Sequence, residues 1–126
     1  MIQVTAAVIR DGEKVMICKR PQGKRFGGQW EFPGGKVEPG ESLFDCIIRE
    51  CQEELSILIE PQKEIVAIEV GDYTLHFIEA VIVSGEMTLN EHAASEWISK
   101  DDIDNYEFCS GDKKALDFIW KQSESF

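Results

Sequence analysis

The chain has 126 residues, of which 43% are hydrophobic and 29% charged, and this fits one globular domain over residues 1–126 with a sizeable core. Its formal net charge of −11 argues against a nucleic-acid polymer as partner, because proteins that bind one need a basic face. No stretch approaches the roughly 18 uninterrupted apolar residues of a membrane span, and no signal peptide opens the chain, so we expect a cytoplasmic protein without membrane contact.

The first predicted elements are two strands joined by a tight turn. Residues 2–10 are rich in β-branched residues and alanine, which is typical of a buried strand. Asp11 and Gly12 form a hairpin turn signal, and residues 14–19 return as the partner strand. The sequence therefore predicts a β-hairpin near the N-terminus.

A glycine-rich, basic loop follows over residues 22–29. Four of the thirteen Lys and Arg residues gather around its start: Lys19, Arg20, Lys24 and Arg25. Such a cluster is either a solvated loop or a clamp for phosphate groups. We favour the clamp, because the rest of the chain is strongly acidic.

The most informative stretch is residues 34–57, which opens with a glycine pair and continues into a predicted helix. Ser42 is the expected N-cap, with Asp45 three residues later. Apolar residues three or four apart supply the buried face of this helix: Leu43, Ile47, Cys51 and Leu55.

The last turns of this helix carry Glu50, Glu53 and Glu54 along one stripe. Like charges at this spacing repel by about 0.2–0.5 kcal/mol per pair, and anions are unfavourable near a helix C-terminus. A solvated acidic face is one interpretation. The other is a site for a hard divalent cation, which would remove the repulsion and would also let an acidic protein accept a polyanionic substrate.

The order of residues around this stripe distinguishes the two interpretations. Gly35, five residues, Glu41, seven residues and then residues 49–54 follow one another in a fixed spacing. This pattern resembles the Nudix box, the signature of the Nudix hydrolases, over residues 35–57. The match departs at Ser56, where glycine is usual, and at Cys51, where a bulkier aliphatic residue is usual.

The resemblance implies an α/β fold, an α/β/α sandwich in which a mixed β-sheet lies between helices. It also implies metal-dependent hydrolysis of a nucleoside diphosphate linked to a further group, with Mg²⁺ as the ion and Mn²⁺ as a possible substitute. The implied metal ligands are the carbonyl of Gly34 and four carboxylates: Glu50, Glu53, Glu54 and Glu91. Glu50 is our choice for the general base, and Glu53 is the position most often found on the metal. Arg49 is implied to orient acidic side chains, and Gly35 and Glu41 are the other structural positions of the box.

Similarity to the MutT-type members of the family implies three substrate contacts. Arg20 would contact the phosphates, Phe32 would line the base pocket and Asp112 would read the edge of the base. An ionised carboxylate accepts from the exocyclic amine of cytosine, whereas Asp at a helix start is also an ordinary N-cap, and both readings of Asp112 stay open.

The remaining elements are a second hairpin, from residues 64–70 and 73–83, a short helix from Asp101 and a final helix over residues 113–121. His76, in the second hairpin, is expected to be a packed or solvent-facing strand residue. The cysteines are expected to be reduced and buried, because their spacing suggests neither a zinc site nor a disulfide framework: Cys18, Cys46, Cys51 and Cys109.

For the substrate, the short chain and the Glu-Phe-Pro-Gly-Gly segment at residues 31–35 favour nucleoside triphosphates. We expect a pyrophosphohydrolase of the 8-oxo-dGTP diphosphatase type, acting in nucleotide-pool housecleaning and so in DNA repair. The alternatives are an enzyme for CTP or a modified dCTP, which Asp112 favours, and a Nudix module that senses a nucleotide without cleaving it. The chain is expected to be a monomer or a homodimer.

Overall fold

The computed structural model describes residues 1–120. Its strands are β1 (Ile2–Asp11), β2 (Lys14–Lys19), β3 (Trp30–Glu31), β4 (Gly34–Lys36), β5 (Leu58–Val70), β6 (Tyr73–Ser84) and β7 (Ala94–Ile98). Its helices are α1 (Leu43–Leu55), the 3₁₀ helix η1 (Lys100–Asn105) and α2 (Ser110–Ile119). Within these residues, no helix is both long enough and apolar enough to cross a membrane.

Strand β1 is the centre of the sheet, whose order is β3-β2-β1-β6-β5. It runs parallel to β6 and antiparallel to β2, so the sheet is mixed, as the resemblance implied. The short strand β4 also pairs with β1, where Thr5 faces Gly35 and Ala6 faces Gly34. This pairing fixes the glycine pair against the middle of the molecule, immediately before the turn into α1.

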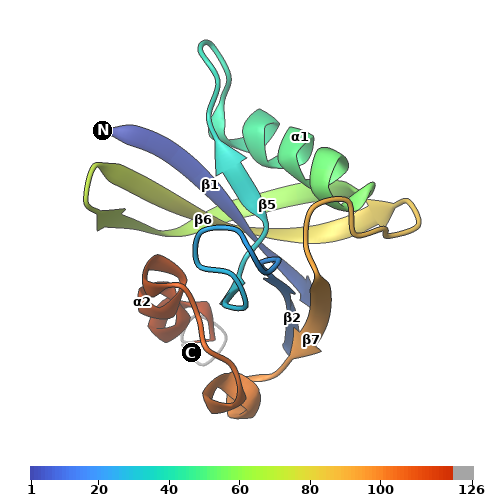
Figure 1. The fold of residues 1–126 in the computed structure, drawn as a ribbon. Coiled ribbons are helices and arrows are strands. Elements are labelled where there is room, and N and C mark those ends of the chain that lie inside the picture. The colour runs from blue at the N-terminus through green and yellow to red at the C-terminus, as the bar shows by residue number, and fades with distance from the viewer. Residues whose placement is uncertain (121–126) are drawn as a thin grey trace, which may run out of the picture.

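The helices α1 and α2 cover opposite faces of the sheet (Figure 1). Successive side chains of a strand point to opposite faces, and the buried residues of β1 divide accordingly. Ala6 and Val8 belong to the core under α2, whereas Ala7 and Ile9 belong to the core under α1. The fold is therefore the predicted α/β arrangement with a mixed sheet between helices.

Both predicted hairpins and the helix α1 are present, but two boundaries differ from the prediction. Strand β5 begins at Leu58, six residues before the predicted start, because β-bulges next to Pro61 and Glu64 let the strand continue along the sheet edge. Helix α2 begins at Ser110, three residues before its predicted start, and Lys121 lies outside the described residues. The short helix at residues 100–105 is a 3₁₀ helix.

Candidate active site

Side chains stabilise both ends of α1, and the cap at its N-terminus is the one that the sequence predicts. The Ser42 hydroxyl accepts a hydrogen bond from the Asp45 N–H at 3.1 Å. At the other end Ser56 takes a left-handed conformation, with φ 59° and ψ 31°. Its hydroxyl lies 2.8 Å from Thr88 Oγ1 and 3.0 Å from Asn90 Nδ2. These contacts stabilise a conformation that usually favours glycine.

Hydrogen bonds of Asn90 and Ala93 place the two residues between them beside the end of α1. The Asn90 N–H donates to the Glu54 carbonyl at 3.0 Å, and its side-chain amide donates to the Glu53 carbonyl at 2.9 Å. Ala93, three residues later, donates its N–H to the Lys19 carbonyl of β2. Glu91 and His92 therefore lie between the end of the helix and strand β2.

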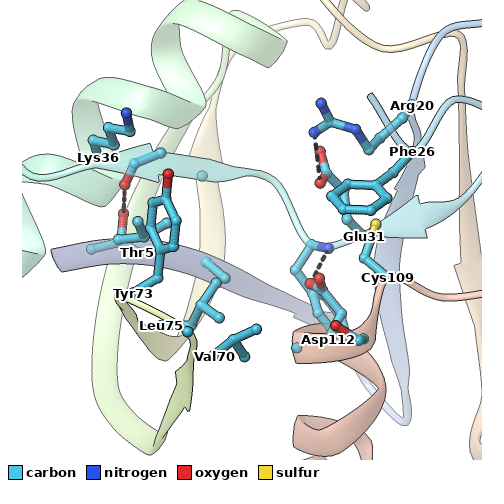
Figure 2. Close-up of a pocket in the computed structure, with 18 of the residues that line it drawn as sticks. Thr5, Arg20, Phe26, Glu31, Lys36, Val70, Tyr73, Leu75, Cys109 and Asp112 are labelled. Atoms are coloured by element: carbon cyan, nitrogen blue, oxygen red, sulfur yellow. Dashed lines mark hydrogen bonds and ion pairs between the residues drawn. The ribbon is translucent and has the colours of Figure 1, made fainter. Parts of the chain in front are cut away.

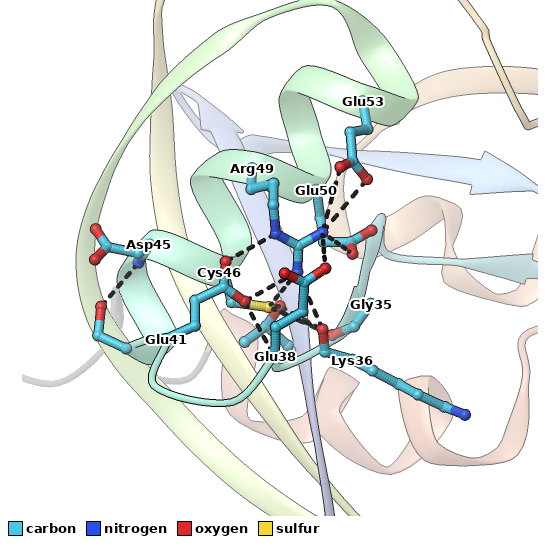
Figure 3. Close-up of polar contacts among 11 residues, drawn as sticks. Gly35, Lys36, Glu38, Glu41, Asp45, Cys46, Arg49, Glu50 and Glu53 are labelled. Atoms are coloured by element: carbon cyan, nitrogen blue, oxygen red, sulfur yellow. Dashed lines mark hydrogen bonds and ion pairs between the residues drawn. The ribbon is translucent and has the colours of Figure 1, made fainter.

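One face of α1 carries carboxylates held by Arg49 (Figure 3). The guanidinium binds both oxygens of Glu41, at 2.8 Å and 2.9 Å, and a third nitrogen binds Glu50 Oε1 at 2.8 Å. Glu53 lies 3.4 Å from that same nitrogen. The Arg49 guanidinium lowers the pKa of the Glu41 carboxyl to about 2. Gly35 is required here, because a Cβ at this position would lie 2.5 Å from the Glu50 carboxylate.

An acidic cavity of about 240 Å³ lies on the other side of Glu50. It is lined by Arg20, Pro21, Lys24, Glu31, Gly34, Glu50, Glu54, Glu91 and His92. Four of the five predicted metal ligands thus line one cavity together with the predicted phosphate-binding arginine. Glu53, the fifth, is exposed and lies outside this lining, next to Glu50 across the Arg49 guanidinium.

The chemistry of the acidic cavity suits a divalent cation. Glu54 is only 4% exposed, and its Oε2 has no hydrogen-bond partner in the part of the chain that the structure describes. Burial raises the pKa of Glu54 to about 10, and a hydrogen bond with Glu50 and the charges of Glu50 and Glu91 add to this. A buried carboxyl group with an unused oxygen beside other carboxylates is unfavourable alone, whereas a hard cation uses these oxygens as ligands.

Two residues of the acidic cavity were not identified from the sequence as site residues. His92 Nε2 lies 2.9 Å from Glu31 Oε2 and 3.7 Å from Glu54 Oε1. The other oxygen of Glu31 accepts from Arg20 Nη1 at 3.1 Å. The available signals were the positions of Glu31 directly before Phe32 and of His92 directly after Glu91, since Phe32 and Glu91 are predicted site residues.

A larger cavity of about 570 Å³ adjoins the acidic one, since Arg20, Glu31 and Gly34 line both. Figure 2 shows the aromatic rings of Phe26 and Tyr73 and the carboxylate of Asp112 on different sides of this larger cavity. Phe32, which is 3% exposed, also belongs to its lining. The three predicted substrate contacts therefore lie at one place, between the first turn of α2 and the basic loop.

Asp112 is a buried acid in the first turn of α2. Its Oδ1 accepts the backbone N–H of Phe32 at 2.9 Å, and the N-cap position of the helix is Cys109. The reading of Asp112 as the N-cap is therefore wrong, because the helix begins earlier and the carboxylate is used to hold β3. Burial raises the pKa of Asp112 to about 7, although the Phe32 N–H opposes this.

Asp112 also belongs to a group of possible metal ligands with Glu31 and Cys109, whose ligand atoms all lie within 4.8 Å of one another. Burial raises the pKa of the Cys109 thiol to about 12, so this thiol stays protonated. A neutral thiol is a poor ligand for a hard cation, and the acidic cavity offers oxygen donors instead.

The sequence profile of the NUDIX domain matches residues 1–118. The chain belongs to the Nudix family. A CTP pyrophosphohydrolase of Escherichia coli is 32% identical over 93% of this chain and 90% of its own length. An 8-oxo-dGTP diphosphatase of Proteus vulgaris is 44% identical, over 44% of this chain and 51% of its own length.

A solved structure has the same fold. A MutT Nudix hydrolase from Burkholderia pseudomallei superposes with a TM-score of 0.83 over 94% of this chain and 97% of its own, at 24% identity. The family and its pyrophosphohydrolase relatives make this Nudix chain a hydrolase of nucleotide anhydrides. Divalent metal ions generally serve the hydrolases of this family.

Proposed function

We propose that this Nudix protein hydrolyses nucleoside triphosphates, with Mg²⁺, to the monophosphate and pyrophosphate. The observation that carries the proposal is the contact between two cavities, one acidic and one lined by aromatic rings, which share Arg20, Glu31 and Gly34. Phosphates bound at the first would place the nucleobase in the second. Since such substrates belong to the nucleotide pool, we place the activity in the cytoplasm.

The acidic side chains of α1 would carry the chemistry. The metal ligands are the Gly34 carbonyl, Glu50, Glu53, Glu54 and Glu91. These residues would hold Mg²⁺, or Mn²⁺ in its place, which would supply charge neutralisation at the phosphates and a more acidic water. Glu50, which Arg49 fixes in orientation, takes the proton from the attacking water as a P–O bond of the anhydride breaks. Glu53, which shares Arg49 Nη1 with Glu50, would be a further ligand.

Arg20 would hold the phosphates. Its side chain now donates to the Arg25 carbonyl at 2.8 Å and to Glu31 at 3.1 Å, so it is already oriented between the two cavities. Phe32 would pack against the base, since aromatic contact with a base contributes about 1–3 kcal/mol. The neighbouring Lys24 adds a second positive charge to the acidic cavity.

Two classes of base are candidates for this pocket. An oxidised guanine triphosphate, 8-oxo-dGTP, matches the housecleaning role that the sequence favours. Asp112 provides the specific observation in favour of cytosine, because its carboxylate is not used as a helix cap and lies at the larger cavity. When ionised it accepts from the cytosine amine, and when protonated it can donate to a carbonyl of oxidised guanine.

The experiment is pyrophosphate release with Mg²⁺ from canonical and oxidised nucleoside triphosphates, ranked by kcat/KM. A lead of about tenfold, or 1.4 kcal/mol, for 8-oxo-dGTP would establish the housecleaning role. The same lead for CTP or a modified dCTP would make Asp112 the reader of the base.

A module that senses a nucleotide without cleaving it is the competing function from a different class. Mg²⁺-dependent turnover that disappears in Glu53→Gln, with the fold intact by circular dichroism, would exclude the sensor. Nucleotide binding without any turnover in the wild type would exclude the enzyme.

A further inference from the structure

His92 has no role in the reaction proposed above, yet its side chain is only 5% exposed and lies in the acidic cavity. Its Nε2 faces two carboxylate oxygens, from Glu31 at 2.9 Å and from Glu54 at 3.7 Å. Its Nδ1 is buried and has no hydrogen-bond partner among residues 1–120. A buried imidazole nitrogen without a hydrogen-bond partner costs free energy. The contacts of the other nitrogen, Nε2, must therefore account for the buried position of His92.

The surroundings decide which nitrogen carries the proton. Two carboxylate oxygens near Nε2 require a donor there, whereas a proton on Nδ1 would be a buried donor without an acceptor. An N–H at Nε2 is therefore the arrangement that fits these contacts. In that arrangement His92 donates to Glu31 and faces Glu54 with the same N–H.

The backbone on both sides of His92 is anchored, so the ring is held in place. The Asn90 N–H donates to the Glu54 carbonyl of α1, and the Ala93 N–H donates to the Lys19 carbonyl of β2. Four side chains then form a continuous series across the acidic cavity, in which each contacts the next: Arg20, Glu31, His92 and Glu54. The series runs from the basic loop to the buried end of α1.

We propose that His92 is a positioning residue for the metal site: together with Glu31, it fixes the carboxyl group of Glu54 so that its unused oxygen faces the cation. The inference rests on the proposed function, because that function makes Glu54 a metal ligand. It adds that Arg20, through Glu31 and His92, belongs to the same series of contacts as the metal ligand.

The test is the affinity of the nucleotide-free protein for Mn²⁺, measured by electron paramagnetic resonance. His92→Phe keeps the ring and removes both nitrogens, and it should weaken Mn²⁺ binding by about 10–100-fold, as loss of a residue that orients a ligand does. His92→Gln places an amide donor near the position of Nε2 and should recover most of the affinity. The control is His76→Phe, because His76 also contacts a carboxylate, Glu64 at 2.6 Å, but lies on β6 away from the acidic cavity.

The outcomes separate positioning from folding. A lower melting temperature in His92→Phe with wild-type Mn²⁺ affinity would overturn the proposal, and so would a His92→Gln variant as weak as His92→Phe. In a double mutant with Glu31→Ala, affinity should fall no further than in the weaker single variant, because the two residues act in series. Additive losses would contradict this.

Failure of the proposed function would look different. If the wild type binds Mn²⁺ and His92→Phe weakens binding, but no nucleoside triphosphate is cleaved, then the reaction is wrong and the positioning role stands. A wild type that binds no Mn²⁺ at all overturns the positioning role directly.

Discussion

Helix α1 presents its carboxylates to two different surroundings. On its outer side Glu41, Glu50 and Glu53 gather around the guanidinium of Arg49, which is raised in pKa by hydrogen bonds with Glu41 and Glu50. On its inner side Glu54 is buried beside further acids, and His92 Nε2 lies 3.7 Å from its Oε1. The carboxylates of the outer group share one arginine as a direct hydrogen-bond partner, whereas Glu54 Oε2 has no such partner among the described residues.

This difference explains how one acidic helix can be both stable and able to bind a cation. The arginine reduces the repulsion among these glutamates, and Glu50 belongs to both groups, because it binds Arg49 and also lines the acidic cavity. The inner acids include an oxygen, Glu54 Oε2, that has no hydrogen-bond partner among the described residues. A metal ion that arrives with a nucleotide would bind these oxygens, so an acidic protein would gain a site for a polyanion.

The largest expected effect follows from removing the inner charge. Glu54→Gln should reduce Mg²⁺-dependent turnover by more than about a hundredfold, since it removes a ligand rather than a residue that only orients one. The metal-free variant should unfold at the same or a higher temperature, because a neutral amide replaces a buried acid. Thermal unfolding with a chelator and turnover with Mg²⁺ measure the two quantities, and Glu60→Gln, at an exposed glutamate of β5, is the control.

Removing the outer cation, Arg49, should mainly lower stability, whereas Glu54→Gln should mainly lower turnover. Arg49→Met leaves Glu41, Glu50 and Glu53 without their common partner, and we expect a loss of about 2 kcal/mol in the free energy of unfolding. Arg49→Lys keeps the charge but not the fork, so it should lose less. Urea denaturation of the metal-free proteins measures this. Equal stability of wild type and Arg49→Met would mean that the outer group needs no neutralisation.

Asp112 is a buried acid that belongs to neither the outer nor the inner group of carboxylates. Because its pKa is raised from 3.8 to about 7, its contribution to stability is present below its ordinary pKa and is lost as the pH rises through about 7. Asp112→Asn should lose this dependence and should be the more stable protein above that pH. Melting temperatures of both proteins across this range give the comparison. Parallel curves would show that the acid is not perturbed in this way.

The smallest effect is expected at acid pH from Glu41. Its pKa is lowered from 4.5 to about 2, so the stability that it contributes is present above its ordinary pKa and is lost as the pH falls through about 2. Glu41→Gln should flatten that part of the stability curve. Chemical denaturation at several acid pH values measures the slope, and an unchanged slope would assign the acid sensitivity to other carboxylates.

Much of α1 could be predicted from the sequence, because its signals are local. Ser42 and Asp45 mark its start, and the spacing of its apolar residues gives the buried face. The position of α2 was harder to predict, because Gly111 resembles a turn residue. In the structure Gly111 lies inside the helix, where a Cβ would be 2.8 Å from Leu75 Cδ1. Glycine there permits close packing rather than ending the helix.

The site depends on contacts that no local pattern encodes. His92 and Glu31 are 61 positions apart in the chain, and they meet because β7 and β3 both pair with β2. The resemblance to the family placed Glu54 and Glu91 in one site, but it gave no information on the histidine that contacts Glu54. Such a partner is found only when the sheet has brought the strands together.

The contact between Ser56 and Asn90 also has a consequence for the order of assembly. It joins segments separated by 34 positions, so the loop that carries Glu91 can reach the helix end only after β5 and β6 have formed their hairpin. We therefore expect the acidic cavity to form late in folding and to be lost early on partial opening. A bound metal ion would link the two segments, and hydrogen exchange of residues 86–93 should slow when it binds.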